Sequence, residues 1–314
     1  RHGPAVSDGR GNLSFTTVNL PRVAIKANRH IDVFFHELES IVTLAARQLH
    51  HRYKVQSHLK VRDMPFLMGQ QIYIGSDQLS PSDEIEPVIK HGTLSIGFIG
   101  LAEALVCLTG SHHGQDENSR VLGLEIVRFM RQLVDRFAEE YDLNYTLLAT
   151  PAEGLSGRFI ALDRNLYGLI DGVTDKEYYT NSYHIPVGYP ISSFEKCTVE
   201  GPFHQYTNAG HISYVELDAP PVNNIEAYET LVRHMAACNM GYAGINFPID
   251  ECEECSHHGV IAEECPVCGS TAIRRIRRIT GYLSTVDRFN DAKKAELSDR
   301  HPHLVNPLKR DADL

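Results

Sequence analysis

Hydrophobic positions along the chain alternate between two periods, and this alternation predicts strands and helices in turn. Residues 13–18 are rich in β-branched and aromatic side chains and predict a strand. Apolar residues recur at helical spacing over residues 31–53 and again over residues 117–141, which predicts two long amphipathic helices. Residues 93–100 predict a buried strand or tight loop that leads into a helix over 101–108. The remaining predicted elements are a short helix near 82–90, strands over 145–149, 211–217 and 242–247, and a helix over 224–238.

The order strand–helix–strand repeats through residues 13–247 and predicts an α/β fold with strands buried under helices. The most apolar stretch, residues 94–110, contains Glu103 and is interrupted by Gly97 and Gly100. A charged stretch of this length is marginal for a membrane span, so we expect it to be buried core. The two glycines allow either an approach of backbone amides to a phosphate or close packing, and we favour packing.

Composition and charge limit the classes of protein that the chain can represent. Of the 314 residues, 42% are hydrophobic and 22% are charged, which is typical of a globular protein in water. The formal net charge of −10 argues against broad binding to nucleic acid or to an anionic membrane, because either needs a positive surface field. The first residue is Arg1 rather than Met, and no signal peptide follows it, so we interpret the sequence as a fragment or a processed product.

Four of the seven cysteines form two C-x-x-C pairs, separated by nine residues. Two such pairs bring four thiolates within tetrahedral reach of one ion, which predicts a structural zinc ribbon over residues 248–275. An iron–sulfur centre or a redox dithiol is the alternative. His257 and His258 lie between the pairs and are expected to face solvent. The predicted ligands are Cys252, Cys255, Cys265 and Cys268.

The other three cysteines, Cys107, Cys197 and Cys238, are scattered singly. Each is predicted to be a small buried hydrophobe rather than a nucleophile. Paired cysteines in a chain of this length favour a metal over a disulfide framework, and this indicates a reducing cytoplasm.

An arginine-rich strand follows the second cysteine pair, with four arginines within residues 273–279. We interpret it as charge compensation for metal-bound thiolates. A nucleic-acid-binding ribbon is the alternative, and the acidic remainder of the chain counts against it. The strand runs into the hexapeptide Arg-Ile-Thr-Gly-Tyr-Leu at residues 278–283. By itself this hexapeptide predicts a strand that ends in a glycine turn, because glycine adopts backbone angles that other residues resist.

Two polar segments have the composition of ligand-binding loops. Residues 150–159 form a predicted turn in which Glu153 and Arg158 bracket flexible backbone, as in a substrate loop. A structural ion pair between these two side chains is an equal alternative. Residues 178–184 are dense in hydroxyl, amide and imidazole groups, which favours hydrogen bonding to a polar ligand.

The ribbon and the Arg-Ile-Thr-Gly-Tyr run beside it resemble the anaerobic, class III ribonucleoside-triphosphate reductases, which are glycyl radical enzymes. The resemblance implies that residues 1–247 are the second half of a ten-stranded α/β barrel whose N-terminal half is missing. A zinc ribbon over residues 248–275 would follow, and then a glycyl radical loop with the C-terminal tail over residues 276–314. Further segments resemble the family in order along nearly the whole chain: residues 9–22, 91–103, 150–159, 178–187 and 208–214.

The family's chemistry gives Gly281 a role. The resemblance implies that Gly281 stores a radical, which a separate radical-SAM iron–sulfur activating enzyme places there. A radical on a glycine α-carbon is delocalised over the flanking peptide groups, and a Cβ would hinder both planarity and access. The radical would pass to a cysteine, whose thiyl form takes the 3′ hydrogen of a ribonucleoside triphosphate before the 2′ hydroxyl is lost, with formate as the reductant. Oxygen would cleave the activated chain at Gly281.

The resemblance also bears on Asn12 and on what the chain lacks. Asn12 aligns with an active-site asparagine of formate-using members, which helps to hold formate or substrate; an ordinary asparagine at a strand start is the alternative.

In the family the thiyl cysteine precedes residues 9–22, and no cysteine occurs here before Cys107. We therefore expect this chain alone to be inactive. The full-length protein is implied to be a cytoplasmic homodimer that acts on neither membrane nor nucleic acid.

Two other functions fit parts of the sequence. A glycyl radical acyltransferase like pyruvate formate-lyase shares the Arg-x-x-Gly-Tyr signature, but that family lacks the ribbon and carries an adjacent Cys-Cys pair, which is absent here. The hypothesis of a non-catalytic zinc-ribbon protein that binds nucleic acid is supported by the arginine run alone.

Overall fold

The first sheet consists of three parallel strands in the order β1–β2–β3. The structure is a computed structural model and describes residue 6 and residues 8–222 and 224–303. The first strand runs from Asn12 to Asn19. Its pairing register with the second strand shifts between Asn12 and Ser14 and is regular from there on. All three strands lie within one or two residues of the predicted ranges: β1 (Asn12–Asn19), β2 (Thr93–Ile99) and β3 (Asn144–Ala149).

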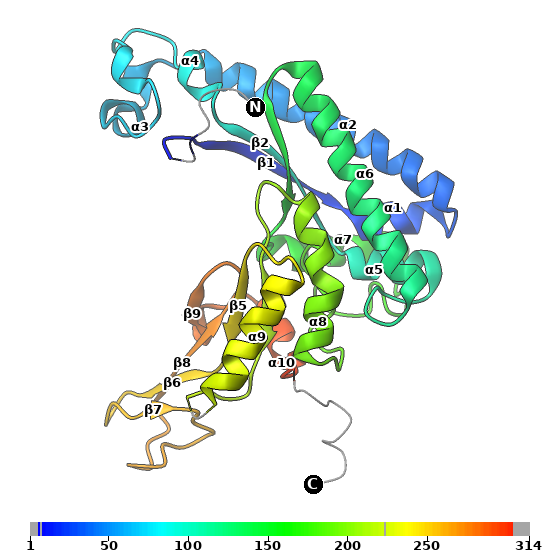
Figure 1. The fold of residues 1–314 in the computed structure, drawn as a ribbon, viewed down its shortest axis with the longest axis vertical. Coiled ribbons are helices and arrows are strands. Elements are labelled where there is room, and N and C mark those ends of the chain that lie inside the picture. Colours follow the sequence, from blue (N-terminus) through cyan, green and yellow to red (C-terminus); the bar gives the residue numbers. More distant parts are fainter. Residues whose placement is uncertain (1–5, 7, 223, 304–314) are drawn as a thin grey trace.

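Two long helices cover one face of this sheet, and Figure 1 shows them side by side. The helix α2 (Ile31–Ser57) buries Phe34, Leu38 and Val42 at helical spacing, as predicted. The helix α6 (Glu117–Tyr141) begins at the N-cap Asp116, whose side chain accepts from the Ser119 amide at 2.8 Å. Each fully buried Leu, Phe or Val contributes about 1.5–3 kcal/mol, so this face holds the main core.

The apolar stretch 94–110 is buried core, as predicted, and is divided between β2 and the helix α5 (Leu101–Thr109). Gly97 and Gly100 allow close packing. A Cβ at Gly97 would lie 2.0 Å from Thr150 Oγ1, and Gly100 has a φ of +77° beside Pro21. Within the described residues no helix is long and apolar enough to cross a membrane.

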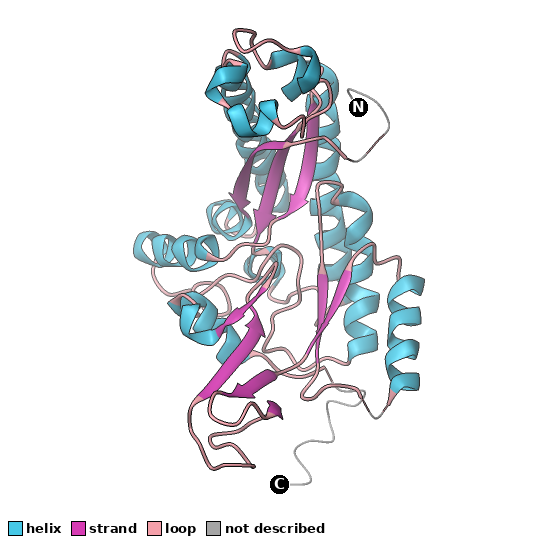
Figure 2. Ribbon diagram, turned by 90° about the vertical axis from the view of Figure 1, so that its left-hand side faces the viewer, coloured by secondary structure: helices cyan, strands magenta, loops and turns pink. Residues whose placement is uncertain are grey.

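A second group of parallel strands continues the same direction. The strands β4 (Ser213–Glu216) and β5 (Ala243–Asn246) pair in parallel and are connected through the helix α9 (Ile225–Ala237). A parallel bridge between Leu148 and Gly210 joins β3 to the approach of β4. The five parallel strands of the described chain thus lie in two sheets, of three and two strands, linked at this bridge, and the fold is mixed α/β. Figure 2 shows the two groups of strands separately.

The C-terminal part is an antiparallel sheet in the order β7–β6–β8–β9, followed by the helix α10 (Asp291–Asp299). Its strands are β6 (Ile249–Cys252), β7 (His258–Gly259), β8 (Ile273–Arg278) and β9 (Leu283–Thr285). The remaining elements connect the sheets: α1 (Leu20–Ala27), α3 (Pro65–Gly69), α4 (Glu86–Ile89), α7 (Gly154–Tyr167), α8 (Ser193–Glu200), and the 3₁₀ turns η1 (Val61–Asp63), η2 (Ser76–Gln78), η3 (Gly201–Tyr206) and η4 (Val286–Arg288). The predicted N-terminal loop before residue 6 and the tail beyond His303 lie outside the described residues.

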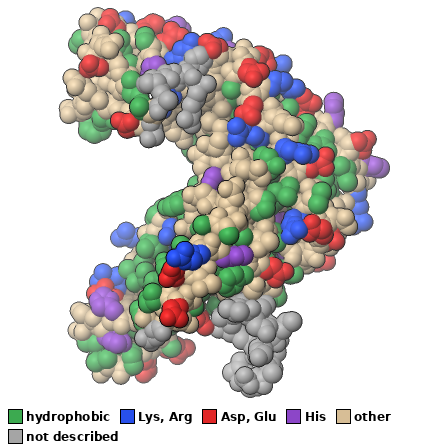
Figure 3. Space-filling view, in the orientation of Figure 1, with side chains coloured by type: hydrophobic (Ala, Val, Ile, Leu, Met, Phe, Trp, Pro, Cys, Tyr) green, Lys and Arg blue, Asp and Glu red, His purple; other side chains and the backbone are tan. Residues whose placement is uncertain are grey.

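One side of the molecule is deeply indented. Figure 3 shows the indentation between the part that carries α3 and the part that carries the antiparallel sheet. The strand β1 is the edge of its sheet, and Phe15 on it is 51% exposed. A groove of about 410 Å³ runs beside this strand and is lined by apolar side chains such as Ile41 and Leu44 together with charged ones such as Arg22 and Glu37. The apolar surface along β1 is thus available to further structure.

The first of the two polar segments differs from its sequence prediction. Residues 154–159 are the first turns of α7 rather than a loop. Glu153 and Arg158 do not form an ion pair among the described contacts, and Glu153 instead accepts from the Tyr282 hydroxyl at 3.3 Å. Residues 178–184 are buried, and several of their polar groups bind the protein itself; for example, Thr180 donates through its amide and its hydroxyl to Glu103. Four of these residues, Tyr178, Thr180, Asn181 and His184, also line a cavity of about 40 Å³, so the ligand-binding interpretation of this segment stays a prediction.

The buried carboxylate of Asp163 joins three parts of the fold. It accepts from Asn19 at 2.7 Å, from Arg22 at 2.5 Å and from the Tyr179 hydroxyl at 2.9 Å, and it is fully buried. We expect Asp163→Asn to lower the free energy of unfolding by about 3 kcal/mol, because Arg22 then loses its counter-charge. Urea unfolding would measure this change. Asp135→Asn, in an exposed pair with Arg131, is the control and should cost less than about 1 kcal/mol. Equal changes in the two variants would contradict the prediction.

Candidate functional site

The hexapeptide 278–283 forms the turn of the β8–β9 hairpin. The Ile279 amide donates to the Tyr282 carbonyl at 2.9 Å and closes the turn around Thr280 and Gly281. Gly281 is exposed, its φ lies outside the left-handed region, and a Cβ built on it meets no heavy atom within 4 Å. The prediction that the turn needs glycine for its backbone angles is therefore wrong. Neither local conformation nor packing requires a glycine at this position.

Side chains from distant parts of the chain bind the turn. Arg300, just after α10, donates to the carbonyls of Arg278 and Ile279 at 2.8 and 3.3 Å. The hydroxyl of Tyr214, on β4, donates to the carbonyl of Thr280. A small cavity of about 40 Å³ lies beneath the turn and is lined by these same side chains. The turn is thus docked on the end of the β4–β5 pair and on the C-terminal segment.

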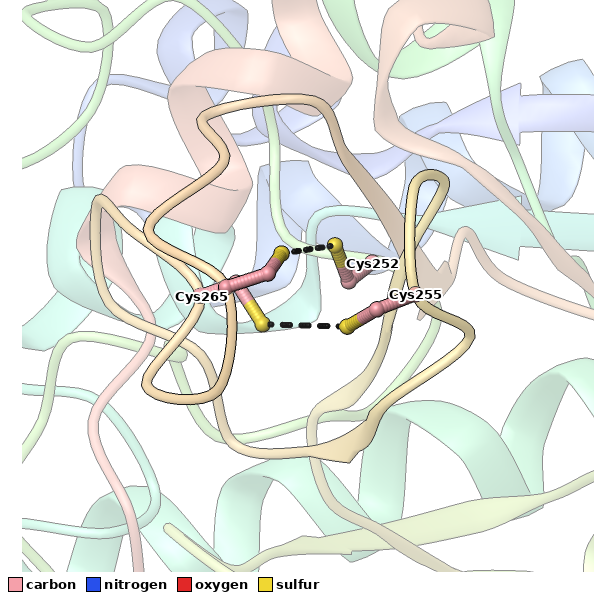
Figure 4. Close-up of side chains that lie close together, drawn as sticks. Cys252, Cys255 and Cys265 are labelled. Carbon is pink, nitrogen blue, oxygen red and sulfur yellow. Dashed lines mark hydrogen bonds between the residues drawn. The ribbon is translucent and has the colours of Figure 1, made fainter.

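Four cysteine side chains converge at the far end of the antiparallel sheet. Figure 4 shows Cys252, Cys255 and Cys265 turned toward one another from two facing turns. The four sulfur atoms, including that of Cys268, all lie within 4.8 Å of one another. Two sulfur pairs are separated by 3.5 and 3.6 Å. A tetrahedral zinc site with bonds of about 2.3 Å has sulfur–sulfur edges of about 3.8 Å, so this donor set fits a zinc ion.

The two cysteine turns share one backbone geometry. The residue after the second cysteine of each pair, Ser256 in one and Gly269 in the other, has a left-handed φ, of +58° and +74°. In each turn an amide donates back to the first cysteine's carbonyl at 2.9 Å, from Ser256 to Cys252 and from Gly269 to Cys265. Glycine at position 269 suits this geometry, because it adopts a left-handed φ without steric cost. His258 is exposed, as expected, while His257 is partly covered.

The arginine run balances carboxylates rather than thiolates. Arg277 contacts the buried Asp250 at 2.6 Å, and Arg275 contacts it at 3.6 Å. Arg274 lies 3.4 Å from Glu251. Each of these arginines is engaged within the protein, which removes the main support for a nucleic-acid-binding ribbon.

Comparisons with known proteins agree with the resemblance in the sequence. The family model described as anaerobic ribonucleoside-triphosphate reductase matches residues 2–303. The chain belongs to this family. Similar proteins are the anaerobic ribonucleoside-triphosphate reductases of Escherichia coli K12, 35% identical over 97% of this chain and 44% of that protein, and of enterobacteria phage T4, 34% identical over 96% of this chain and 50% of that protein. The chain thus spans about half the length of these relatives or less.

Solved structures of the family share the fold of the chain. A structure titled anaerobic ribonucleotide reductase superposes with a TM-score of 0.79 at 20% identity, over 95% of this chain and 46% of that one. The anaerobic ribonucleotide reductase from Thermotoga maritima in complex with dATP and CTP gives 0.72 at 20% identity, over 92% and 45%. At this identity the likeness is one of fold alone.

The other site residues expected of a family member lie apart from the turn. Asn12 is at the amino end of β1 and accepts from Thr93 Oγ1 at 3.3 Å. The residue after Gly281, Tyr282, contacts Glu153, which lies beyond the carboxyl end of β3. Asn12 lies at the opposite end of these parallel strands, so the described contacts do not bring Asn12 and Gly281 together.

Among the single cysteines, burial raises the pKa of Cys107 and raises that of Cys197 to about 12. Both thiols therefore stay protonated at neutral pH.

Sequence reasoning missed Arg300 and its partner Glu296, which lies 2.8 Å from the guanidinium, and singled out Tyr214 only as part of a family-like segment. Arg300 comes after the hairpin, and nothing in its local sequence indicates that it folds back onto the preceding turn. Tyr214 reaches the turn from 66 residues away. A regular pattern of acidic and basic residues at helical spacing over residues 293–300 is the one local signal of a structured segment there.

Proposed function

We propose that this chain is the C-terminal part of an enzyme that reduces ribonucleoside triphosphates to 2′-deoxyribonucleoside triphosphates without oxygen, by glycyl and thiyl radical chemistry. The observation that carries the proposal is Gly281. A family member has glycine at an exposed turn where neither φ nor packing requires it. A chemical requirement explains the residue: a radical at an α-carbon without Cβ is planar, open to its partner and delocalised over both peptide groups.

The test uses the full-length parent under strictly anaerobic conditions. The protein is incubated with its radical-SAM activating enzyme, S-adenosylmethionine and a reductant, and the EPR spectrum is recorded. We expect a glycine-centred doublet and, on addition of ribonucleoside triphosphate and formate, deoxyribonucleotide product. An absent signal, with an activating enzyme that is competent on another substrate protein, would disprove the radical assignment.

We infer that the five parallel strands are half of the ten-stranded barrel expected from the resemblance. Two features support this. All five strands pair in parallel within two sheets that a parallel bridge links, and β1 presents an open edge with apolar side chains beside it. The remainder of the full-length protein would pair with this edge and would supply the thiyl cysteine, a role that we assign to none of the seven cysteines here. A homodimer of the full-length protein and a cytoplasmic location remain part of this proposal.

We further propose that Cys252, Cys255, Cys265 and Cys268 hold one zinc ion. Four thiolate donors leave no open position for substrate, so the ion would supply structure rather than catalysis. The sheet continues from β6 through β8 into the turn at Gly281, and the metal would therefore fix one end of the hairpin that presents this glycine.

Asn12 is the proposed contact for formate or substrate. We expect Asn12→Ala in the full-length enzyme to lower formate-dependent turnover roughly tenfold or more, because a polar group placed for substrate typically contributes about 1–3 kcal/mol. The radical yield should stay unchanged. Thr93→Val, which removes only the hydrogen-bond partner of Asn12, is the control for disturbance of the strand start. Formate-dependent turnover equal to that of the unmodified enzyme would contradict the assignment.

A further inference from the structure

The main chain that leads into Gly281 is held at three successive peptide groups. Arg300 binds the carbonyls of Arg278 and Ile279, and Tyr214 binds that of Thr280. After Gly281, the described side-chain contact is that of the exposed Tyr282, whose hydroxyl donates to Glu153 at 3.3 Å. The peptide group before the glycine is therefore fixed from outside the hairpin, and the α-carbon itself is left open.

Arg300 is a donor with a fixed orientation. Its side chain is 11% exposed, and it contacts Glu296 at 2.8 Å and Glu216 at 3.9 Å. Lys293, which is fully buried, also donates to Glu296. Burial acts to raise the pKa of Glu296, but the charges of Lys293 and Arg300 outweigh it and lower that pKa. The ionised carboxylate thus keeps the guanidinium aimed at the two carbonyls.

Two neighbouring side chains contact the aromatic ring of Tyr214. The guanidinium of Arg278 lies 5.2 Å from the ring centroid, and the imidazole of His184 stacks on the ring at 5.6 Å and 29°. Burial raises the pKa of Tyr214 to about 12, so its hydroxyl stays protonated at neutral pH. His184 is itself placed by the buried Glu200 at 3.4 Å, which also accepts from Lys196. The hydroxyl that donates to Thr280 is therefore held in place through contacts with its ring.

We propose that Arg300 and Tyr214 are positioning residues that together fix the three peptide groups between Arg278 and Gly281, so that the α-carbon of Gly281 is presented on the open face of the hairpin. The role rests on the proposed function of Gly281. Hydrogen-atom transfer needs the reacting atoms within about 3–3.5 Å of each other, and a misplacement of about 1 Å costs roughly a hundredfold in rate. Three carbonyl contacts before the glycine restrict such displacement.

The test compares Tyr214→Phe, Arg300→Lys and the double variant with the unmodified full-length protein. Tyr228→Phe and Arg233→Lys, both on exposed positions of α9, are matched controls. The first readout is hydrogen exchange of the Ile279 amide, which is bonded within the turn. We expect exchange roughly threefold to tenfold faster in each variant, confined to residues 279–282, and unchanged in the controls. This exchange measurement requires no radical.

The second readout is turnover per radical after activation. We expect a glycine-centred EPR signal in the variants, with turnover per radical lowered tenfold or more and with KM for the nucleotide little changed. Unchanged exchange and turnover in both variants would overturn the proposal, as would exchange that accelerates throughout the chain. An unmodified protein without a radical would refute the proposed function of Gly281 and with it the positioning role, whereas the exchange result would still measure the hold on the turn.

Discussion

Gly281→Ala in the full-length protein is expected to abolish the glycine-centred EPR signal and all turnover, while the free energy of unfolding changes by less than about 0.5 kcal/mol. The two halves of this expectation have different origins. Loss of the radical follows from chemistry, because the methyl group hinders a planar α-carbon and the approach of its partner. Unchanged stability follows from structure, because the added Cβ meets nothing within 4 Å and φ is already one that alanine adopts.

Gly269→Ala is the matched control for this experiment. Gly269 also lies at an exposed turn with open space around it, but its φ is +74°. Alanine there should cost about 1–2 kcal/mol through backbone strain and should leave the radical in place. A Gly281→Ala protein that still gives the signal would contradict the radical assignment. One that is destabilised as much as Gly269→Ala would contradict the description of the turn.

Cys265→Ser is expected to remove the metal from the protein and to unfold the two cysteine turns. Zinc binding contributes about 10–16 kcal/mol to the folding of small Cys-ligated units, and three thiolates with an alcohol bind far more weakly. Elemental analysis of the purified protein should give one zinc per unmodified chain and little in the variant. Cys238→Ser, at a partly buried cysteine outside the cluster, should retain the zinc. Iron alone, or no metal in the unmodified protein, would contradict the assignment.

Loss of the metal should not unfold the whole antiparallel sheet. The strands β6 and β8 are also joined by Asp250, which contacts Arg277 at 2.6 Å and accepts from the Ile261 amide at 3.1 Å. We therefore expect hydrogen exchange to accelerate within residues 252–272 and to stay slow along β8. Turnover should fall as well, to the extent that the hairpin loses one of its supports.

The long helices and the parallel strands could be predicted because their sequences carry a regular pattern over many residues. The predicted range 117–141 coincides with α6, whose buried positions repeat every three or four residues. The cysteine cluster was equally predictable, since two C-x-x-C pairs bring their donors together through local turns. Its geometry follows from residues within about twenty positions of one another.

The start of α7 could not be predicted, because tertiary contacts override its composition. Gly154 and Gly157 favour a turn locally. In the fold Gly157 faces Ala292 of α10, and a Cβ at Gly157 would lie only 2.6 Å from the Ala292 Cβ. The glycine that weakens the helix by itself thus allows the two helices to touch. The burial of residues 178–184 could not be predicted for a related reason, because several of their polar groups find partners on elements far away in the sequence.

The C-terminal segment is attached to the body of the protein independently of the peptide bond at Gly281. Asp299 accepts from the Tyr178 hydroxyl at 2.7 Å, and His303 exchanges two hydrogen bonds with the backbone of Glu216, each of 2.8 Å. Oxygen damage that cuts an activated chain at the glycine would therefore leave both pieces in place. The damaged enzyme would run at its full mass under native conditions and would separate into two bands only in denaturant, so size measured on the folded protein underestimates how much of it has been destroyed.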